Sequence, residues 1–310
     1  MASTSVSRTC TRSTGTTVGL TRRGIAHQIE FADCRSGPWS KLYFSMEKHF
    51  KSLLRRLMPR TIRKHRIWAG PLRGQQIVTS WHDYPTAILG RTERFLLAWF
   101  QENVALGDTW LDVGAHYGYT AIALSRMVGP HGRVFAFEPM FSTAGHLAQT
   151  RLLNHLPQLT VLPLAVASPE ALELKRLPSV RGMIDSTLGT REWSETILVA
   201  RLDWLWSRIR GDQDRIDGVK IDVQGMEIEV LRGMSDLLKT LKPKLVIELH
   251  HGVARRDVLE LLEAVGYSRC GIPIEPAPGE TDPLYLDDRN YEFRATTAVG
   301  RPQQAADSRD

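Results

Sequence analysis

Residues 109–139 constrain the fold of this chain more than any other stretch. A short apolar run, Trp110 to Val113, passes through Gly114 and Gly118 directly into a segment with helical spacing, which predicts a strand, a tight turn and a helix. Glycine at the turn lets backbone N–H groups approach a ligand, and the positive end of the helix points to the same place. We therefore expect a nucleotide-like ligand at this turn.

A second strand supports the same interpretation. Val134 to Phe137 are apolar and are followed by Glu138, whose carboxylate can accept hydrogen bonds from both hydroxyls of a ribose. A dinucleotide-binding turn reads GxGxxG, whereas this one has Asp112 two residues before the first of only two glycines. The spacing favours S-adenosylmethionine over NAD, and an NAD-dependent oxidoreductase remains an alternative.

The charge of the chain is unevenly distributed. The formal net charge is +6, but the first 75 residues alone carry +12, so the rest carries −6. The body is mildly acidic, and no nucleic acid partner is expected for it. Residues 1–45 are rich in Ser, Thr and Arg and should be a disordered extension, either a targeting segment or one without function.

A basic amphipathic helix is expected to begin at Met46. Its apolar positions have helical spacing, and lysines and arginines fill the opposite face. Packing on the catalytic domain is favoured over peripheral contact with an anionic membrane, and a non-catalytic, membrane-docking module is the alternative from another functional class. No run of 18 apolar residues occurs, so no membrane span is expected.

The strand-turn-helix pattern of the first motif is repeated at residues 217–227, where an apolar strand ends in Asp222 and passes through Gly225 into a helix. Ligands bind outside the carboxyl ends of such strands, so Asp222 should face the cofactor. The next strand, Leu245 to His250, also ends in polar residues.

With these two motifs, the chain resembles the FkbM family of S-adenosylmethionine-dependent, class I methyltransferases over roughly residues 85–296. Gln224 stands where that family commonly has glutamate, and Glu93 matches a G-x-x-E element before the first motif. The resemblance implies these cofactor-binding residues: Asp112, Gly114, Ala115, Gly118, Glu138, Pro139, Ala165, Val166 and Asp222.

The alternation of strands and helices predicts an α/β fold with a doubly wound, mostly parallel sheet. The resemblance implies a Rossmann-like sheet of seven strands with an antiparallel last hairpin partner. The expected organisation is an extension over 1–45, the basic helix and lead-in over 46–84, the methyltransferase domain over 85–296 and a disordered tail over 297–310.

Methyl transfer to a hydroxyl needs a base. Asp222 is the first candidate, and Glu248 and His250 at the tip of the next strand are the others; the structural alternative for Asp222 is a cap on the following helix. His250 and His251 are adjacent on a strand and should point to opposite faces. A zinc site has no support, because the three cysteines show no CxxC spacing. Mg²⁺ between Asp222 and Glu248 is an alternative that nothing in the sequence requires, so no metal is expected.

The predicted function is O-methylation of a hydroxyl on a small molecule or carbohydrate, with oxygen as acceptor implied by the resemblance alone. Nitrogen-directed methyltransferases often carry an Asn/Asp-Pro-Pro-aromatic signature where this chain has Asp222-Val-Gln-Gly. A cytoplasmic location is expected, since the cysteine pattern is typical of a reducing compartment.

Overall fold

The computed structural model describes residues 57–180, 183–184, 194–275 and 285–296. The chain divides into two units, Met1–Arg60 and Thr61–Asp310. The expected extension over 1–45, nearly all of the helix expected from Met46 and the tail over 297–310 lie outside the described residues. The unit from Thr61 onward contains the elements that position the site.

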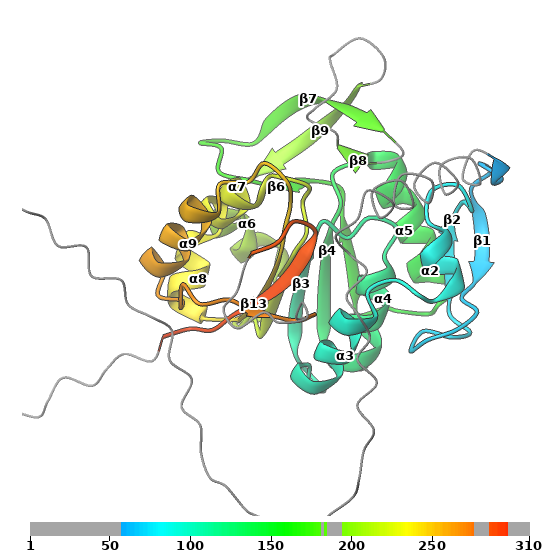
Figure 1. The fold of residues 1–310 in the computed structure, drawn as a ribbon, viewed down its shortest axis with the longest axis horizontal. Helices are drawn as coiled ribbons and strands as arrows, with labels where there is room; N and C mark the ends of the chain where they lie inside the picture. The colour runs from blue at the N-terminus through cyan, green and yellow to red at the C-terminus, as the bar shows by residue number, and fades with distance from the viewer. Residues whose placement is uncertain (1–56, 181–182, 185–193, 276–284, 297–310) are drawn as a thin grey trace, which may run out of the picture. The chain divides into compact units, whose positions relative to one another are not determined.

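A seven-stranded sheet forms the centre of this unit (Figure 1), in the order β12-β13-β11-β10-β3-β4-β5. Strands β3, β4, β5, β10 and β11 pair in parallel, and β13 runs antiparallel to both β11 and β12. The predicted mostly parallel, seven-stranded sheet is confirmed. The bounds are β3 Thr109–Val113, β4 Arg133–Phe137, β5 Leu159–Leu162, β10 Gly218–Ile221, β11 Lys244–Leu249, β12 Ile272–Pro273 and β13 Arg289–Phe293.

Helices cover both faces of the sheet (Figure 1), because the side chains of a strand alternate between the faces. Trp110 packs in the core that contains residues of α3, α4 and α5, whereas Leu111 and Val113 pack in the core formed with α6, α7, α8 and α9. The bounds are α3 Arg94–Asn103, α4 Tyr119–Val128, α5 Phe141–Leu153, α6 Leu202–Ile209, α7 Glu227–Gly233, α8 Ser235–Leu241 and α9 Arg255–Ala264.

The lead-in before the first motif is part of the same packed unit. β1 (Arg63–Arg66) and β2 (Gln76–Thr79) form an antiparallel hairpin, followed by the short helix α2 (Pro85–Leu89). The N–H of Val78 donates to Oγ1 of Thr150 on α5 at 2.9 Å. Ile67, Leu72 and Ile77 belong to the core around Trp110. The hairpin therefore stabilises α5, the helix that follows Glu138.

A second sheet lies beyond β5 in the chain and has the order β6-β9-β7-β8. Its strands are β6 Ala165–Val166, β7 Glu173–Val180, β8 Met183–Ile184 and β9 Ser194–Ala200. β6 is buried, pairs in parallel with β9 and begins only three residues after the end of β5, so this sheet starts close to the end of that strand of the main sheet.

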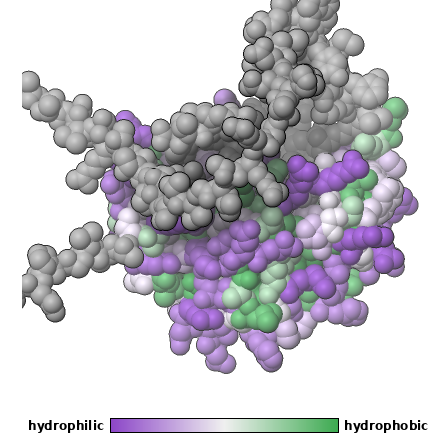
Figure 2. Space-filling view, turned by 60° about the horizontal axis from the view of Figure 1, so that its bottom comes forward, coloured by the Kyte–Doolittle hydropathy of each residue, from purple (hydrophilic) through white to green (hydrophobic). Residues whose placement is uncertain are grey.

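The surface is mixed in character. Figure 2 shows one face, on which hydrophilic residues predominate and hydrophobic residues form small separate groups. In the part of the chain that the structure describes, no helix combines the length and the apolar character needed to cross a membrane.

Candidate active site

The turns that follow β3 and β10 touch at the carboxyl edge of the sheet. Gly114 has a positive φ of 86°, and a Cβ added to it would lie 1.8 Å from the carbonyl oxygen of Asp222. Any side chain at position 114 would collide with the backbone after β10, so glycine is required there. This contact places the turn at 114–118 directly against Asp222.

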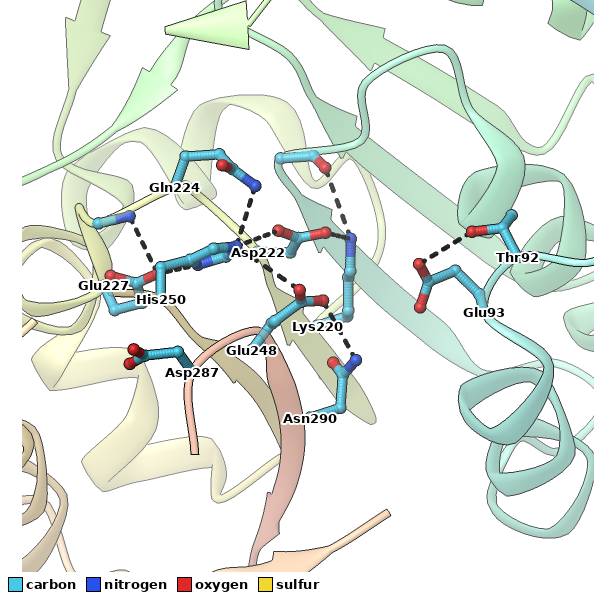
Figure 3. A network of polar contacts seen from close by, with 12 residues as sticks. Thr92, Glu93, Lys220, Asp222, Gln224, Glu227, Glu248, His250, Asp287 and Asn290 are labelled. Atoms are coloured by element: carbon cyan, nitrogen blue, oxygen red, sulfur yellow. Dashed lines mark hydrogen bonds and ion pairs between the residues drawn. The ribbon is translucent and has the colours of Figure 1, made fainter. Parts of the chain in front are cut away.

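A buried lysine holds the acids of the two strands together (Figure 3). Lys220 lies opposite Asp112 in the register of β3 and β10, and its contact with Asp222 is drawn in Figure 3. Its Nζ is 3.4 Å from Oδ1 of Asp112 and 3.0 Å from Oδ2 of Asp222, and its side chain is only 3% exposed. Burial lowers the pKa of Lys220, but the carboxylates of Asp222, Asp112 and Glu93 raise it more. The ammonium is therefore retained, and it neutralises part of the negative charge under the turn.

Glu138 follows β4 and is nearly fully buried. Its Oε2 accepts the N–H of His116 at 2.9 Å, and its Oε1 accepts the N–H of Met140 at 3.0 Å. Burial raises the pKa of Glu138 to about 7, against the lowering effect of these two hydrogen bonds. A carboxylate has about four acceptor positions, so each oxygen keeps one for a further donor.

The other residues predicted to bind the cofactor lie near Glu138 and the turn after β3. Gly118 precedes α4, and a Cβ there would lie 2.1 Å from Cδ1 of Leu147. Ala115 donates its N–H to the carbonyl of Phe137 at 3.0 Å, and Pro139 follows Glu138 directly. Ala165 shares a small buried cluster with Met140, whereas Val166 packs into the core with α6 to α9. The structure thus brings Ala165, but not the side chain of Val166, next to the residues that follow Glu138.

His250, just past β11, lies among carboxylates from three elements (Figure 3). Its Nδ1 is 2.6 Å from Oε1 of Glu227, and its Nε2 is 3.4 Å from Oδ1 of Asp222 and 3.6 Å from Oε1 of Glu248. The side chain of His250 is 7% exposed, whereas that of His251 is 92% exposed. The two side chains differ in exposure, but both residues follow the end of β11 at Leu249, so the alternation of a strand, on which the prediction of opposite faces relied, does not extend to them.

The three candidate bases differ in proton affinity. Burial raises the pKa of Asp222, but Lys220 and His250 outweigh it, and the pKa is lowered. Burial, with the charges of Asp222 and Glu93, raises the pKa of Glu248 to about 8. Burial lowers the pKa of His250, but its hydrogen bond to Glu227 and the nearby carboxylates raise it overall. Asp222 is the weakest base of the three, because its charge is already stabilised by Lys220.

The hydrogen bonds around α7 bear on the capping alternative for Asp222. The N–H of Gly225 donates to Oε1 of Glu227 at 3.2 Å, and the carboxylate of Asp222 accepts from Lys220. The acid at the start of the helix is therefore Glu227, while Asp222 faces Lys220 and His250.

Glu93 lies on the opposite side of Lys220 from Glu248 (Figure 3). It precedes α3 with a positive φ of 51°, and its Oε1 accepts from the hydroxyl of Thr92 at 3.3 Å. Burial raises the pKa of Glu93, and the charges of Lys220 and Asp222 also act on it. Glu93 thus interacts with the charges under the turn, and its place near the cofactor pocket, which its match to the G-x-x-E element suggests, stays a prediction.

Sequence reasoning assigned no role to Lys220 or Glu227. A lysine inside a strand whose four residues are all buried is a usable signal, because a buried ammonium needs acidic partners. Glu227 carried no such signal, since an acid in the first turn of a helix is usually explained by the helix dipole alone.

Asp222, Glu248 and His250 each offer one atom within 4.8 Å of the others, an arrangement that could hold a metal ion. Lys220 already contacts Asp222 at 3.0 Å, and the amide nitrogen of Gln224 is 2.9 Å from Nε2 of His250. Two of the three side chains are thus engaged by donors of the protein itself, and we assign no metal to the cluster. The expectation of no metal stays a prediction.

The sheet order, the glycine turn after β3, the acid near the end of β3 and the acids after β4 and β10 are the features of a class I methyltransferase. The family model described as "Methyltransferase FkbM domain" matches residues 112–269. The chain belongs to the FkbM methyltransferase family, and it is an S-adenosylmethionine-dependent methyltransferase.

Individual relatives were also found. Hexuronic acid methyltransferase AglP from Haloferax volcanii is 31% identical over 173 residues, which cover 56% of this chain and 68% of the relative. Among solved structures, methyltransferase FkbM from Methylobacillus flagellatus matches with a TM-score of 0.40 and 16% identity, covering 85% of this chain and 63% of its own. Fibrillarin from Aeropyrum pernix, in complex with S-adenosyl-L-methionine, matches with a TM-score of 0.42 and 15% identity, covering 76% of this chain and 89% of its own.

The donors and acceptors at the edge of β3 and β4 fit S-adenosylmethionine. Glu138 keeps acceptor positions for the two hydroxyls of a ribose, as counted above. Oδ1 of Asp112 is buried without a hydrogen bond and has Lys220 as its ion-pair partner at 3.4 Å. The surrounding acids suit a cofactor that carries positive charge on its sulfonium and amino groups.

Proposed function

We propose that the enzyme methylates a hydroxyl group of a small molecule or carbohydrate. The observation that supports this most is the convergence of His250, Asp222 and Glu248 beside the turn at Gly114. A hydroxyl is a poor nucleophile until its proton leaves, and a positioned base contributes about 10²–10⁴-fold to such a step. A site that joins a histidine and two carboxylates has the groups to accept that proton.

The charge of the site favours a neutral acceptor over a carboxylate. Around Lys220 and His250 lie the carboxyl groups of Glu93, Asp222, Glu227 and Glu248, so acids outnumber cations. A carboxylate acceptor would be repelled by these acids and would need no base. The relative named for hexuronic acid supports a carbohydrate as acceptor class, and the charges point to its hydroxyls.

We assign the cofactor to the edge formed by β3 and β4. Glu138 holds the ribose, Asp112 and the turn at Gly114, Ala115 and Gly118 shape the pocket, and Ala165 lies next to it. Bound S-adenosylmethionine supplies a methyl group on a positively charged sulfur. The protein aligns the acceptor oxygen with that methyl group, excludes water and removes the proton.

The test is a transfer assay with deuterated methyl donor and two acceptor panels, neutral glycosides and uronic acids. Mass spectrometry should find the label on neutral glycosides, and it should survive mild alkali, which cleaves methyl esters but leaves methyl ethers intact. Label in an alkali-labile ester, or on nitrogen, would contradict the hydroxyl acceptor. Heat-inactivated protein is the control.

Replacing Glu138 with alanine should weaken cofactor binding by about 1.5–3 kcal/mol, because two hydroxyls lose a charged acceptor. Since burial raises the pKa of Glu138 to about 7, wild-type affinity should rise as the pH passes from 6 to 8 and the carboxyl ionises. Titration calorimetry across this range measures both effects. Glu102→Ala, at an exposed position on α3, is the matched control; unchanged affinity in Glu138→Ala would remove Glu138 from the site.

Cytoplasmic location belongs to the same proposal and rests on the cysteine spacing. Fractionation of cells that express the full chain, with detection in cytosol, membrane and exported fractions, decides the point. Peripheral membrane contact through the basic helix from Met46 would appear as protein that salt releases from the membrane fraction.

A further inference from the structure

Glu227 is the most completely buried acid next to the candidate bases. It is the first residue of α7, and its side chain is 0% exposed. Its Oε1 accepts the N–H of Gly225 at 3.2 Å and contacts Nδ1 of His250 at 2.6 Å. The contact to His250 is the shorter of the two, and it joins α7 to the end of β11.

This contact determines which nitrogen of His250 carries the proton. An ionised carboxylate can only accept hydrogen bonds, so Nδ1 of His250 must donate to Glu227. In the neutral ring Nε2 then carries a lone pair. The amide nitrogen of Gln224, 2.9 Å from Nε2, is a donor that suits a lone pair at that position, and it must be displaced when an acceptor hydroxyl takes its place.

We propose that Glu227 is a positioning residue that fixes His250 in the Nδ1–H form, so that Nε2 receives the proton of the acceptor hydroxyl. This rests on the proposed function, because it assigns the proton acceptor of that reaction. The proposal gives the acids different roles. Glu227 orients His250, while Asp222 and Glu248 face Nε2, the nitrogen that becomes protonated.

The step balances without a further reactant. The oxygen of the acceptor forms a bond to the methyl carbon, the bond from that carbon to sulfur breaks, and its electron pair stays on sulfur. The proton of the hydroxyl moves to Nε2 of His250. The resulting imidazolium faces Oδ1 of Asp222 at 3.4 Å and Oε1 of Glu248 at 3.6 Å, and it later releases the proton to solvent.

Charged groups face His250 from several elements. Glu227 comes from α7, Asp222 from the loop after β10 and Glu248 from β11, while Lys220 reaches Asp222 at 3.0 Å. Arg255 of α9 donates to the carbonyl of His250 at 2.7 Å. The carboxylates of Glu227 and Asp222 favour the imidazolium and outweigh the effect of burial, while Glu248, whose pKa is raised to about 8, adds its charge only as the pH rises. In a plot of kcat/KM against pH, activity should therefore rise with a pKa above the ordinary pKa of histidine.

Two variants change the charge next to His250 in opposite directions. Glu227→Gln removes a negative charge and keeps the size, so the acid limb of kcat/KM should move to lower pH. Its amide can also donate to Nδ1 and impose the wrong tautomer, an effect that lowers turnover by up to about 10⁴-fold in an analogous His–Asp pair. Gln224→Glu adds a negative charge beside Nε2, so the limb should move to higher pH.

The nitrogen NMR chemical shifts of the His250 ring report its tautomer, and this measurement needs no methyl acceptor. Wild-type protein should show the Nδ1–H tautomer once the ring is neutral, and Glu227→Gln should show a mixture or the other tautomer. Thermal melting is followed in parallel, because Glu227 also accepts from Gly225 and could serve as a cap alone.

Three results would overturn the proposal: an unshifted pH profile in Glu227→Gln, a Nε2–H tautomer in wild type, or loss of wild-type activity in EDTA, which would make the cluster a metal site. Failure of the proposed function looks different. In that case no hydroxyl of either panel is methylated, while the tautomer measured by NMR is still held by Glu227.

Discussion

His250→Asn should lower turnover by at least about 10²-fold while cofactor affinity and melting temperature stay close to wild type. Asparagine keeps an N–H that can donate to the buried Glu227, so that carboxylate is not left unpaired. It has no basic nitrogen, so it cannot accept the proton of the acceptor hydroxyl. Single-turnover kinetics with a neutral glycoside acceptor measure the effect.

The adjacent histidine is a matched control. His251 is 92% exposed and pairs with Asp287 at 3.0 Å, outside the cluster, so His251→Asn should leave turnover unchanged. Asp222→Asn and Glu248→Gln complete the comparison. A larger loss in Asp222→Asn than in His250→Asn, with cofactor affinity retained in both, would return the role of base to Asp222.

The sheet and the cofactor edge could be predicted because they depend on local pattern. Each apolar strand ended in an acid or a glycine, and the carboxyl ends of parallel strands meet at one edge. Asp112, Gly114 and Glu138 therefore lie together whatever the details of packing. The two-residue repeat of a strand was applied to His250 and His251 as well, but both residues follow β11, so their different exposure comes from the turn after that strand.

Pairings between strands could not be predicted in the same way. Asp222 ranked first as base because it ends a strand, but its proton affinity depends on Lys220, two residues earlier on the same face. The partner of Lys220 across the sheet is Asp112, 108 residues away, which becomes visible only when β3 is known to lie beside β10 in this register. The contact of Glu227 with His250 likewise requires the position of α7 relative to β11.

Lys220→Met should destabilise the protein by about 3–5 kcal/mol at neutral pH, the range observed when one partner of a buried ion pair is removed. Methionine fills a similar volume, so the loss comes mainly from charge. Asp112 is 0% exposed, and without Lys220 the partner that the described residues leave it is the hydroxyl of Thr120, at 2.7 Å from Oδ2. Urea unfolding at pH 7 measures the free energy of unfolding, and Lys239→Met, at an exposed position on α8, should change it by no more than about 0.5 kcal/mol.

The pH dependence of this loss identifies its cause. Without the ammonium, Asp112 is a buried carboxylate that has lost its ion-pair partner, and burial raises the pKa of Asp222 above that of the unfolded chain. The cost of the unpaired charge is therefore full at neutral pH and falls as the pH drops and a proton is taken up. The difference between Lys220→Met and wild type should therefore shrink at pH 5. If the loss were the same at pH 5 and pH 7, it would come from packing rather than from unpaired carboxylates. The role of Lys220 as the charge that holds the turns after β3 and β10 together would then be wrong.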